Sequence, residues 1–415
     1  MSCRGVRNLV AALSLMVAVA SPGVAEEAAD WPKVIAQLQQ HLYRAPNHEE
    51  ARRQLAIAYN NYGVQLGEAG RWDLAVSQFQ EAIRLDGANE SLRHNFANIR
   101  LRQAYDAYQR HQTAEAIQAL DHVVALNPEL AQAYILRGRI EYDRQKLKEA
   151  KAAWQRALEL DPAQTDVARQ LEQLNQELPV ESDFERLSQA HFDIRYEERV
   201  EQPVWYDLRD VLFEARRLVG SDFAYWPDHK LVVLVYRADS FRKLRQETPE
   251  WVAGQFDGKI RVSLPSVQRD EAWVRNSLFH EYTHALIHDL SHGRCPTWLN
   301  EGLAEYQGRT QAPGSLALLT KAYETQQLVP WPQLSDQLTM ARPTEQVGLG
   351  YEQSYSIVAY LAQRYGFWRF RRLLKAIDGG AAWPDAMESE YHLKLSHLEE
   401  DWREWLPELL RGVTR

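Results

Sequence analysis

Residues 280–284 are His-Glu-Tyr-Thr-His, in the middle of a segment with helical periodicity that extends from Glu271 to Leu290. The next such segment begins at Pro296, after a turn that contains Gly293. Residues four positions apart lie on the same face of an α-helix, so the two histidines of the first segment point in one direction. The sequence therefore predicts two helices joined by a short turn, with two imidazoles side by side on the first helix.

The spacing of His280 and His284 allows both imidazoles to bind one metal ion, and zinc is the metal that this pattern favours. Glu281 is poorly placed to bind the same ion, but well placed to accept a proton from a metal-bound water. The pattern also occurs by chance in long chains, so a third ligand is needed. Glu301 follows His284 after sixteen intervening residues, enough for a turn and an antiparallel return.

Residues 298–306, WLNEGLAEY, closely resemble the third-ligand helix of the gluzincin zinc peptidases, which include the M1-type aminopeptidases. The resemblance implies that Glu301 joins His280 and His284 as the third ligand of Zn²⁺, with Glu281 as the catalytic base. It also implies that Glu305, one turn after Glu301, accepts the other ring N–H of His280. The alternative for Glu305 is an ordinary solvated charge.

Two further histidines lie near the motif. His288 continues the four-residue series, but three histidines on one straight helix diverge around an ion. The metzincin pattern would need a glycine and a histidine where Ile287 and Leu290 stand. We therefore expect His288 and His292 to be surface residues or to support the ligands rather than bind the metal.

Peptide hydrolysis also needs a donor for the oxyanion of the tetrahedral intermediate, which gluzincins usually supply as a tyrosine from a later helix. Tyr351 and Tyr355 are the candidates. We prefer Tyr351, because it is expected to open a helix behind Gly348 and Gly350, where a side chain can project into a cleft. Either tyrosine could equally be a packing aromatic.

Residues 252–257, VAGQFD, together with Ile260–Leu264, fit the substrate-binding edge strand that usually precedes the first ligand helix. The M1-type aminopeptidases carry Gly-x-Met-Glu-Asn there, and its glutamate holds the free amine of the substrate. This chain has Gly-Gln-Phe-Asp at 254–257 instead. An endopeptidase is therefore favoured over an aminopeptidase, with an extended peptide pairing along the edge as an added strand.

The segment around this motif has strands first and helices afterwards, which indicates an α+β domain. Strands are expected at 191–196, 230–236 and 260–264, a helix at 204–219, and mostly helices from 271 onward. By the resemblance, residues 184–415 form a gluzincin-like domain of thermolysin type.

The N-terminal half contains one helix ending three times, at residues 81–87, 123–128 and 156–162. Pro128 and Pro162 are 34 residues apart, which is the period of the tetratricopeptide (TPR) repeat that these segments resemble. Pro46, Gly87 and Pro128, which each follow an expected helix, are spaced by 41 residues. The surplus of seven over 34 equals two helical turns, which lengthens a helix without rotating its apolar face.

We therefore expect an all-α TPR solenoid over residues 26–178, followed by a linker at 179–183. Its parts are a capping helix at 31–46, three repeats at 47–162 and a closing helix at 165–178. Stacked helix pairs of this type form a concave groove, which predicts binding of a protein partner or a peptide. The alternative is a spacer that shapes or shields the neighbouring domain.

The first 25 residues resemble a secretory signal peptide. Arg4 and Arg7 precede an apolar run from Leu9 to Ala20, and small residues end at Ala25. Export to the bacterial periplasm or the medium follows, unless this segment is an uncleaved amphipathic N-terminus. No other segment approaches the ~20 apolar residues of a membrane span.

A net charge of −9 argues against a nucleic-acid partner, because binding to phosphates needs a surplus of basic side chains. Taken together, the sequence predicts an exported zinc metallopeptidase that acts on peptides or proteins, similar to bacterial proteins of the peptidase MA-like group that carry TPR repeats. Two alternatives stay open. One is an exported, non-catalytic TPR scaffold with a structural or silent metal site, and the other is an amidase that acts on a cell-wall peptide.

Overall fold

The computed structural model describes residues 30–197, 202–244, 254–264, 271–339 and 342–413. The expected signal peptide, residues 1–25, lies outside the described residues. The chain divides into two compact units, the first ending at Leu178 and the second beginning at Pro179. Among the helices of the described ranges, none is both long enough and apolar enough to cross a membrane.

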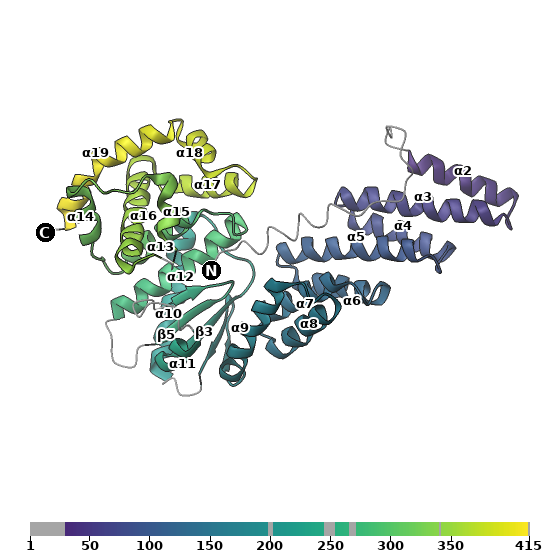
Figure 1. The fold of residues 1–415 in the computed structure, drawn as a ribbon, viewed down its shortest axis with the longest axis horizontal. Helices are drawn as coiled ribbons and strands as arrows, with labels where there is room; N and C mark the ends of the chain where they lie inside the picture. The colour runs from purple at the N-terminus through teal and green to yellow at the C-terminus, as the bar shows by residue number, and fades with distance from the viewer. Residues whose placement is uncertain (1–29, 198–201, 245–253, 265–270, 340–341, 414–415) are drawn as a thin grey trace. The chain divides into compact units, whose positions relative to one another are not determined.

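From residue 30 to residue 181 the described chain consists of helices and short turns (Figure 1). The helices are α2 (Trp31–Arg44), α3 (Glu49–Glu68), α4 (Trp72–Leu85), α5 (Glu90–Gln109), α6 (Thr113–Leu126), α7 (Ala131–Asp143), α8 (Leu147–Leu160) and α9 (Thr165–Glu181). Helix α2 corresponds to the expected cap, and α3 to α8 form three pairs. Helices α3 and α5 have 20 residues each and α7 has 13, so the predicted seven-residue surplus lengthens the first helix of the first two pairs.

In two of the three helix pairs, a glycine on one helix faces a large aromatic ring on the other. A Cβ atom added to Gly138 on α7 would lie 2.2 Å from Cδ1 of Trp154 on α8. Gly63 on α3 faces Phe79 on α4 in the same way, at 2.8 Å. Both rings are completely buried. The glycines therefore let the helices of these two pairs approach until the ring covers the opposite backbone.

Helix α9 is longer than the predicted closing helix, because it continues through Pro179 to Glu181 and makes the first part of the expected linker helical. Proline removes one backbone donor from a helix and normally destabilises it. The side chain of Glu181 offsets this destabilisation at the end of the helix. Its carboxylate accepts hydrogen bonds from Tyr236 and from Arg261, each at 2.6 Å, in the interior of the second unit. Breaking this pairing would leave a buried charge without compensation, so the contact holds the last turn in place.

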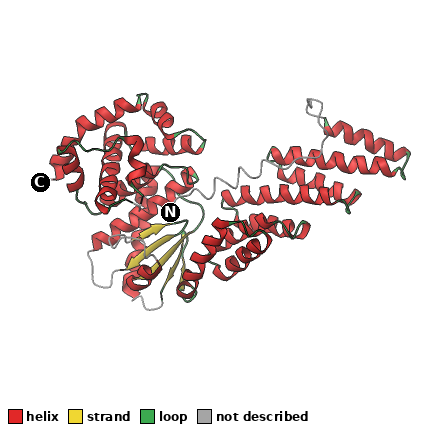
Figure 2. Ribbon diagram, viewed as in Figure 1, coloured by secondary structure: helices red, strands yellow, loops and turns green. Residues whose placement is uncertain are grey.

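The second unit begins with a mixed sheet, drawn in yellow in Figure 2. The sheet has five strands in the order β1-β2-β3-β5-β4. The strands are β1 (Glu185–Ser188), β2 (Phe192–Tyr196), β3 (Leu231–Arg237), β4 (Gly254–Phe256) and β5 (Ile260–Leu264). The three central strands are parallel, and β1 and β4 pair antiparallel at the edges. Strands β2, β3 and β5 lie within a residue of the predicted strands, whereas β1 was not predicted.

Helices follow the sheet, as expected of an α+β arrangement. They are α10 (Gln202–Phe223), α11 (Ala238–Leu244), α12 (Glu271–Ser291), α13 (Thr297–Arg309), α14 (Ala317–Glu324), the 3₁₀ turn η1 (Trp331–Gln333), α15 (Leu334–Gln337), α16 (Thr344–Tyr365), α17 (Trp368–Asp378), α18 (Trp383–Tyr391) and α19 (Leu395–Val413). Helix α12 packs against α10, α13, α17 and the strands β4 and β5. It is apolar on most sides and forms the centre of the core.

Two glycines place α13 in close contact with both of its neighbouring helices. A Cβ atom added to Gly302 would lie 2.6 Å from the carbonyl oxygen of Ser354 on α16. One added to Gly308 would lie 3.1 Å from the backbone oxygen of Asn276 on α12. A side chain at either position would push the helices apart. The spacing of α12, α13 and α16 therefore depends on these two residues.

Helix α16 corrects a second expectation. It begins at Thr344, so Tyr351 lies about two turns inside the helix rather than at its start. Gly348 and Gly350 are helical and serve packing, because Cβ atoms there would approach the side chains of Leu318 and Leu338 to 2.7 and 3.0 Å. Glycine usually marks a helix boundary in a sequence, and here that general tendency was misleading.

The contact between Gly138 and Trp154 leads to a testable prediction about the first unit. Gly138→Ala should lower the free energy of unfolding of this unit by about 1–3 kcal/mol, because the added methyl group overlaps the buried indole. In a Trp154→Ala background the same change should cost nothing or stabilise slightly, since alanine favours helix over glycine by about 1 kcal/mol. Urea unfolding of the four proteins measures this coupling. Equal effects in the two backgrounds would contradict the packing described above.

Candidate metal centre

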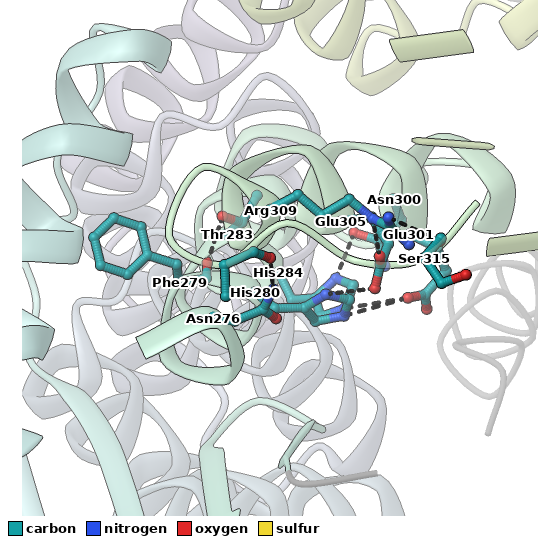
Figure 3. A network of polar contacts seen from close by, with 11 residues as sticks. Asn276, Phe279, His280, Thr283, His284, Asn300, Glu301, Glu305, Arg309 and Ser315 are labelled. Carbon is teal, nitrogen blue, oxygen red and sulfur yellow. Dashed lines mark hydrogen bonds and ion pairs between the residues drawn. The ribbon is translucent and has the colours of Figure 1, made fainter. Parts of the chain in front are cut away.

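The candidate ligands come from two helices that the glycine contacts bring together. Helix α12 carries His280 and His284 on one face, and α13 carries Glu301. Between the helices, His292 and Gly293 both adopt positive φ angles, of 45° and 71°, which reverses the chain within a short turn. The short turn and the close approach of the two helices together direct the Glu301 carboxylate toward the two imidazoles (Figure 3).

Three ligand atoms converge at this point. Nε2 of His280 lies 3.0 Å from Nε2 of His284. Oε2 of Glu301 lies 3.6 Å from Nε2 of His280 and 3.4 Å from Nε2 of His284. The three residues form a group that could hold a metal ion.

The donor set and its dimensions fit zinc. Ligand distances of about 2.0–2.1 Å in a tetrahedral site place neighbouring ligand atoms roughly 3.3–3.4 Å apart. The three observed separations, from 3.0 to 3.6 Å, bracket this value. Two imidazole nitrogens and one carboxylate oxygen are also the ligand types of many catalytic zinc sites, which keep a fourth position for water.

The charges of the three groups support one another. Burial alone would raise the pKa of the Glu301 carboxyl, but the adjacent His284 and His280 outweigh it and hold that pKa well below its usual range. Burial alone would lower the pKa of both histidines, but Glu301 reverses this and raises the pKa of each. The site therefore concentrates negative charge beside two imidazoles, as a cation site requires.

The second ring nitrogen of each histidine has its own partner. Nδ1 of His284 lies 3.1 Å from Oδ1 of Asn300, and Nδ1 of His280 lies 3.4 Å from Oε1 of Glu305. Since both partners offer acceptor oxygens, they favour a proton on each Nδ1, which leaves a lone pair on each Nε2 for a metal ion. The Glu305 side chain is only 20% exposed and also accepts from Arg309, so the alternative of a solvated charge does not describe it.

Glu281 lies close enough to the candidate ligands for their charges to act on it, and it also lies against strand β4. Its side chain is buried, and its Oε2 atom has no hydrogen-bond partner among the described residues. Burial raises the pKa of Glu281, against the opposing effect of His280 and His284. A Cβ atom added to Gly254 on β4 would lie 2.6–2.7 Å from Cγ and Oε1 of Glu281. The glycine therefore leaves the room that the Glu281 carboxylate occupies, beside the last strand of the sheet.

The two candidate tyrosines occupy different surroundings on α16. Burial raises the pKa of Tyr351 strongly, and the negative charges of Glu301, Glu305 and Glu281 raise it further, with Glu301 having the largest effect of the three. Tyr355 instead lies under the guanidinium of Arg309, whose Cζ is 4.6 Å from the ring centroid, and near the ring of Tyr306. The structure therefore brings Tyr351 to the candidate ligands, and it places Tyr355 one turn further along, against Arg309.

The other histidines near the motif lie outside this group. The His288 ring packs against Phe256, with ring centroids 5.6 Å apart. Nδ1 of His292 lies 2.8 Å from Oδ1 of Asp378 in an exposed position. Asp257, in the segment that this chain has in place of the amine-binding motif, accepts a hydrogen bond from Arg261 at 3.0 Å. Val252 and Ala253 of the expected edge segment lie outside the described residues.

Sequence reasoning missed three residues that shape this site. Asn300 orients His284, Arg309 holds Glu305, and Gly254 makes space for Glu281. Asn300 could have been recognised from the sequence, because it stands directly before the candidate ligand Glu301. Arg309 stands four residues after Glu305 on one helix, a spacing that was readable from the sequence. The contact of Gly254 with Glu281 instead depends on the approach of a strand to a helix.

Comparison with known proteins finds two families whose models match segments of this chain. Residues 246–408 match the Peptidase MA superfamily, and residues 131–164 match the tetratricopeptide repeat. The chain therefore combines a Peptidase MA superfamily domain, which includes α12, α13 and α16, with TPR repeats. The matched repeat covers α7 and α8, the pair closed by Gly138 and Trp154.

Two similar proteins each match about a third of the chain. The human RNA polymerase II-associated protein 3 is 30% identical over 125 residues, which are 30% of this chain and 18% of that protein. The chain thus spans less than a fifth of the length of this relative. A solved structure of the first TPR domain of Spaghetti (RPAP3), bound to an HSP90 peptide, is 28% identical and covers 30% of this chain and 94% of its own, with a TM-score of 0.23.

The charge pairing in the site predicts a pH dependence of the metal-free protein. The folded pKa is raised above 6.5 for His280 and His284 and lowered below 4.5 for Glu301. The stability from this pairing is therefore complete between those values and is lost as the pH rises through the raised histidine pKa. In the metal-free protein, Glu301→Gln should lower the free energy of unfolding more at about pH 6 than at about pH 9.

Urea unfolding in the presence of chelator measures this difference. Glu324→Gln on α14 is the control, because Glu324 is exposed and belongs to a different helix from the candidate ligands. The control should show equal and small effects at the two pH values. If Glu301→Gln behaved like the control, the charge pairing described here would be wrong.

Proposed function

We propose that this chain is a zinc-dependent metallopeptidase in which His280, His284 and Glu301 bind Zn²⁺ and Glu281 is the general base. One observation carries the proposal. Three ligand atoms of the zinc type converge within 3.6 Å of one another, beside a buried carboxylate oxygen that has no partner among the described residues. When bound, zinc would acidify a water molecule and polarise the scissile carbonyl.

The protein groups around the ligands have distinct roles in this proposal. Glu281 accepts the proton of the attacking water and passes it to the leaving amine. Its burial helps the second step, because a raised pKa allows the carboxyl group to hold the proton between the two transfers. Tyr351 donates its hydroxyl proton in a hydrogen bond to the oxyanion, and its burial keeps that hydroxyl protonated.

The substrate that fits this arrangement is an extended peptide. Strand β4 is the last strand in the sheet order and lies against α12, so a peptide that pairs with its outer side would pass close to Glu281. Asp257 is engaged by Arg261 rather than presented as an amine anchor. This contact favours an endopeptidase over an aminopeptidase. We also propose that the domain that carries the site is of the expected thermolysin type.

The proposal extends to the first unit and to the location of the protein. We propose that the three helix pairs bind a protein or peptide in their groove and so bring substrates or partners to the enzyme. The N-terminal sequence supports export to the bacterial periplasm or the medium. The rival proposal is a non-catalytic scaffold with a silent metal site. Absence of turnover in the activity measurement below would favour it.

The general-base role of Glu281 predicts a loss of turnover without a loss of metal. Glu281→Gln should lower kcat by roughly 10²–10⁴-fold, because the amide cannot accept the proton of water. Bound zinc should stay at one ion per chain, since Glu281 is not a ligand. Casein and a fluorogenic peptide library, assayed with and without chelator, report turnover, and elemental analysis reports zinc.

Glu324→Gln is again the control and should match the wild-type protein in both measurements. Turnover of Glu281→Gln at the wild-type rate, with zinc bound, would remove the peptidase proposal. Turnover of a cell-wall peptide in place of casein would keep the metal chemistry and change the substrate class to that of an amidase.

The two tyrosines give a second, independent test. Tyr351→Phe should lower kcat by about 10²–10³-fold with little change in KM, because its hydroxyl acts on charge that develops only in the transition state. Tyr355→Phe keeps the ring under Arg309 and should retain activity. Steady-state kinetics of the two variants decide the assignment. The reverse order of effects would transfer the oxyanion role to Tyr355.

A further inference from the structure

A line of contacts leads away from the candidate ligands and ends at Arg309. Glu305 uses both of its carboxylate oxygens. Oε1 lies 3.4 Å from Nδ1 of His280, and Oε2 accepts a hydrogen bond from Nε of Arg309 at 2.8 Å. Figure 3 shows this line from the imidazole through the carboxylate to the guanidinium. Glu305 and Arg309 are four residues apart on α13, so neighbouring turns of one helix make the contact.

The guanidinium of Arg309 is held on several sides. Its Cζ atom lies over the ring of Tyr355 on α16, and Nη1 donates to the carbonyl oxygen of Ser315 at 3.2 Å. A Cβ atom added to Gly314 would lie 2.7 Å from Nη1, so this glycine leaves the space that the guanidinium fills. The Arg309 side chain is only 11% exposed. A planar cation with these contacts has little freedom to turn.

A pair of the same type on the surface shows what is particular about this one. Arg403 and Glu399 on α19 are also four residues apart and also 2.8 Å from each other, but the Arg403 side chain is 44% exposed. Exposed pairs of this kind contribute little, because water screens them and their side chains must be ordered. The pair of Arg309 and Glu305 is mostly buried, and its carboxylate also touches a candidate ligand.

We propose that Arg309 is a positioning residue for the metal centre, which acts through Glu305 on His280. By directing one carboxylate oxygen, Arg309 keeps the other beside Nδ1 of His280, and this keeps Nε2 of His280 toward the ion. Without Arg309, Glu305 could rotate and the imidazole could turn or change tautomer, which weakens a ligand. The inference rests on the proposed function, since it assumes that this cluster binds zinc.

Zinc affinity without substrate tests the inference. Competition with a chromophoric chelator should show Arg309→Met about 10-fold weaker in zinc affinity than the wild-type protein. Arg309→Lys should recover part of the loss, because the ammonium restores the charge but not the planar geometry of the guanidinium. Arg403→Met is the matched control and should bind zinc like the wild-type protein. Wild-type affinity in Arg309→Met would overturn the inference.

A double-mutant cycle separates positioning from a general structural role. In a Glu305→Gln background, Arg309→Met should cost no further zinc affinity, because its effect passes through the carboxylate. A loss of the same size in both backgrounds would show that Arg309 only supports the fold, and would overturn the inference. Thermal unfolding of the metal-free variants checks their folding. If Arg309→Met does not fold, Arg309→Lys completes the same cycle.

These outcomes separate the failure of this inference from the failure of the proposed function. Zinc binding that Arg309 variants leave unchanged removes the role of Arg309 and leaves the metal centre in place. Absence of zinc binding in the wild-type protein removes both. Zinc affinity that follows the predicted cycle, together with no turnover of any peptide, removes the peptidase and keeps Arg309 as a positioning residue.

Discussion

The candidate site depends on the close approach of helix α13 to α12. Gly308 meets the backbone of Asn276 on one side, and Gly302 meets the carbonyl group of Ser354 on the other. At this separation the Glu301 carboxylate lies 3.4–3.6 Å from two imidazole nitrogens. A buried carboxylate is costly unless cationic groups or a metal compensate it. Packing and electrostatics therefore constrain the same few atoms, and the supporting contacts of the site extend outward from them.

The features that were predictable from the sequence are those that depend on local spacing. Two histidines four residues apart share a helix face in any α-helix, so the arrangement of His280 and His284 needed no knowledge of the fold. The repeats were readable for the same reason, since the period of 34 and the surplus of seven residues map onto the lengths of α3, α5 and α7. Glu301 required more, because its place was inferred from a resembling segment.

The features that were not predictable depend on elements that are distant in the sequence. Gly254 approaches Glu281 because β4 is paired at the edge of the sheet beside α12, and Arg309 is enclosed by Tyr355 and Ser315 from other segments. The start of α16 was misplaced because its glycines serve packing. Helix α9 continued past Pro179 because a buried ion pair holds its end. In each case a tertiary contact overrides a local tendency.

The central claim is that one zinc ion is bound by His280, His284 and Glu301. Diffraction data collected on both sides of the zinc absorption edge, from crystals of the purified protein, test it most directly. The account predicts one strong anomalous peak within about 2.0–2.2 Å of Nε2 of both histidines and of a Glu301 carboxylate oxygen. A peak bound by other residues, or no peak in protein that contains stoichiometric zinc, would contradict it.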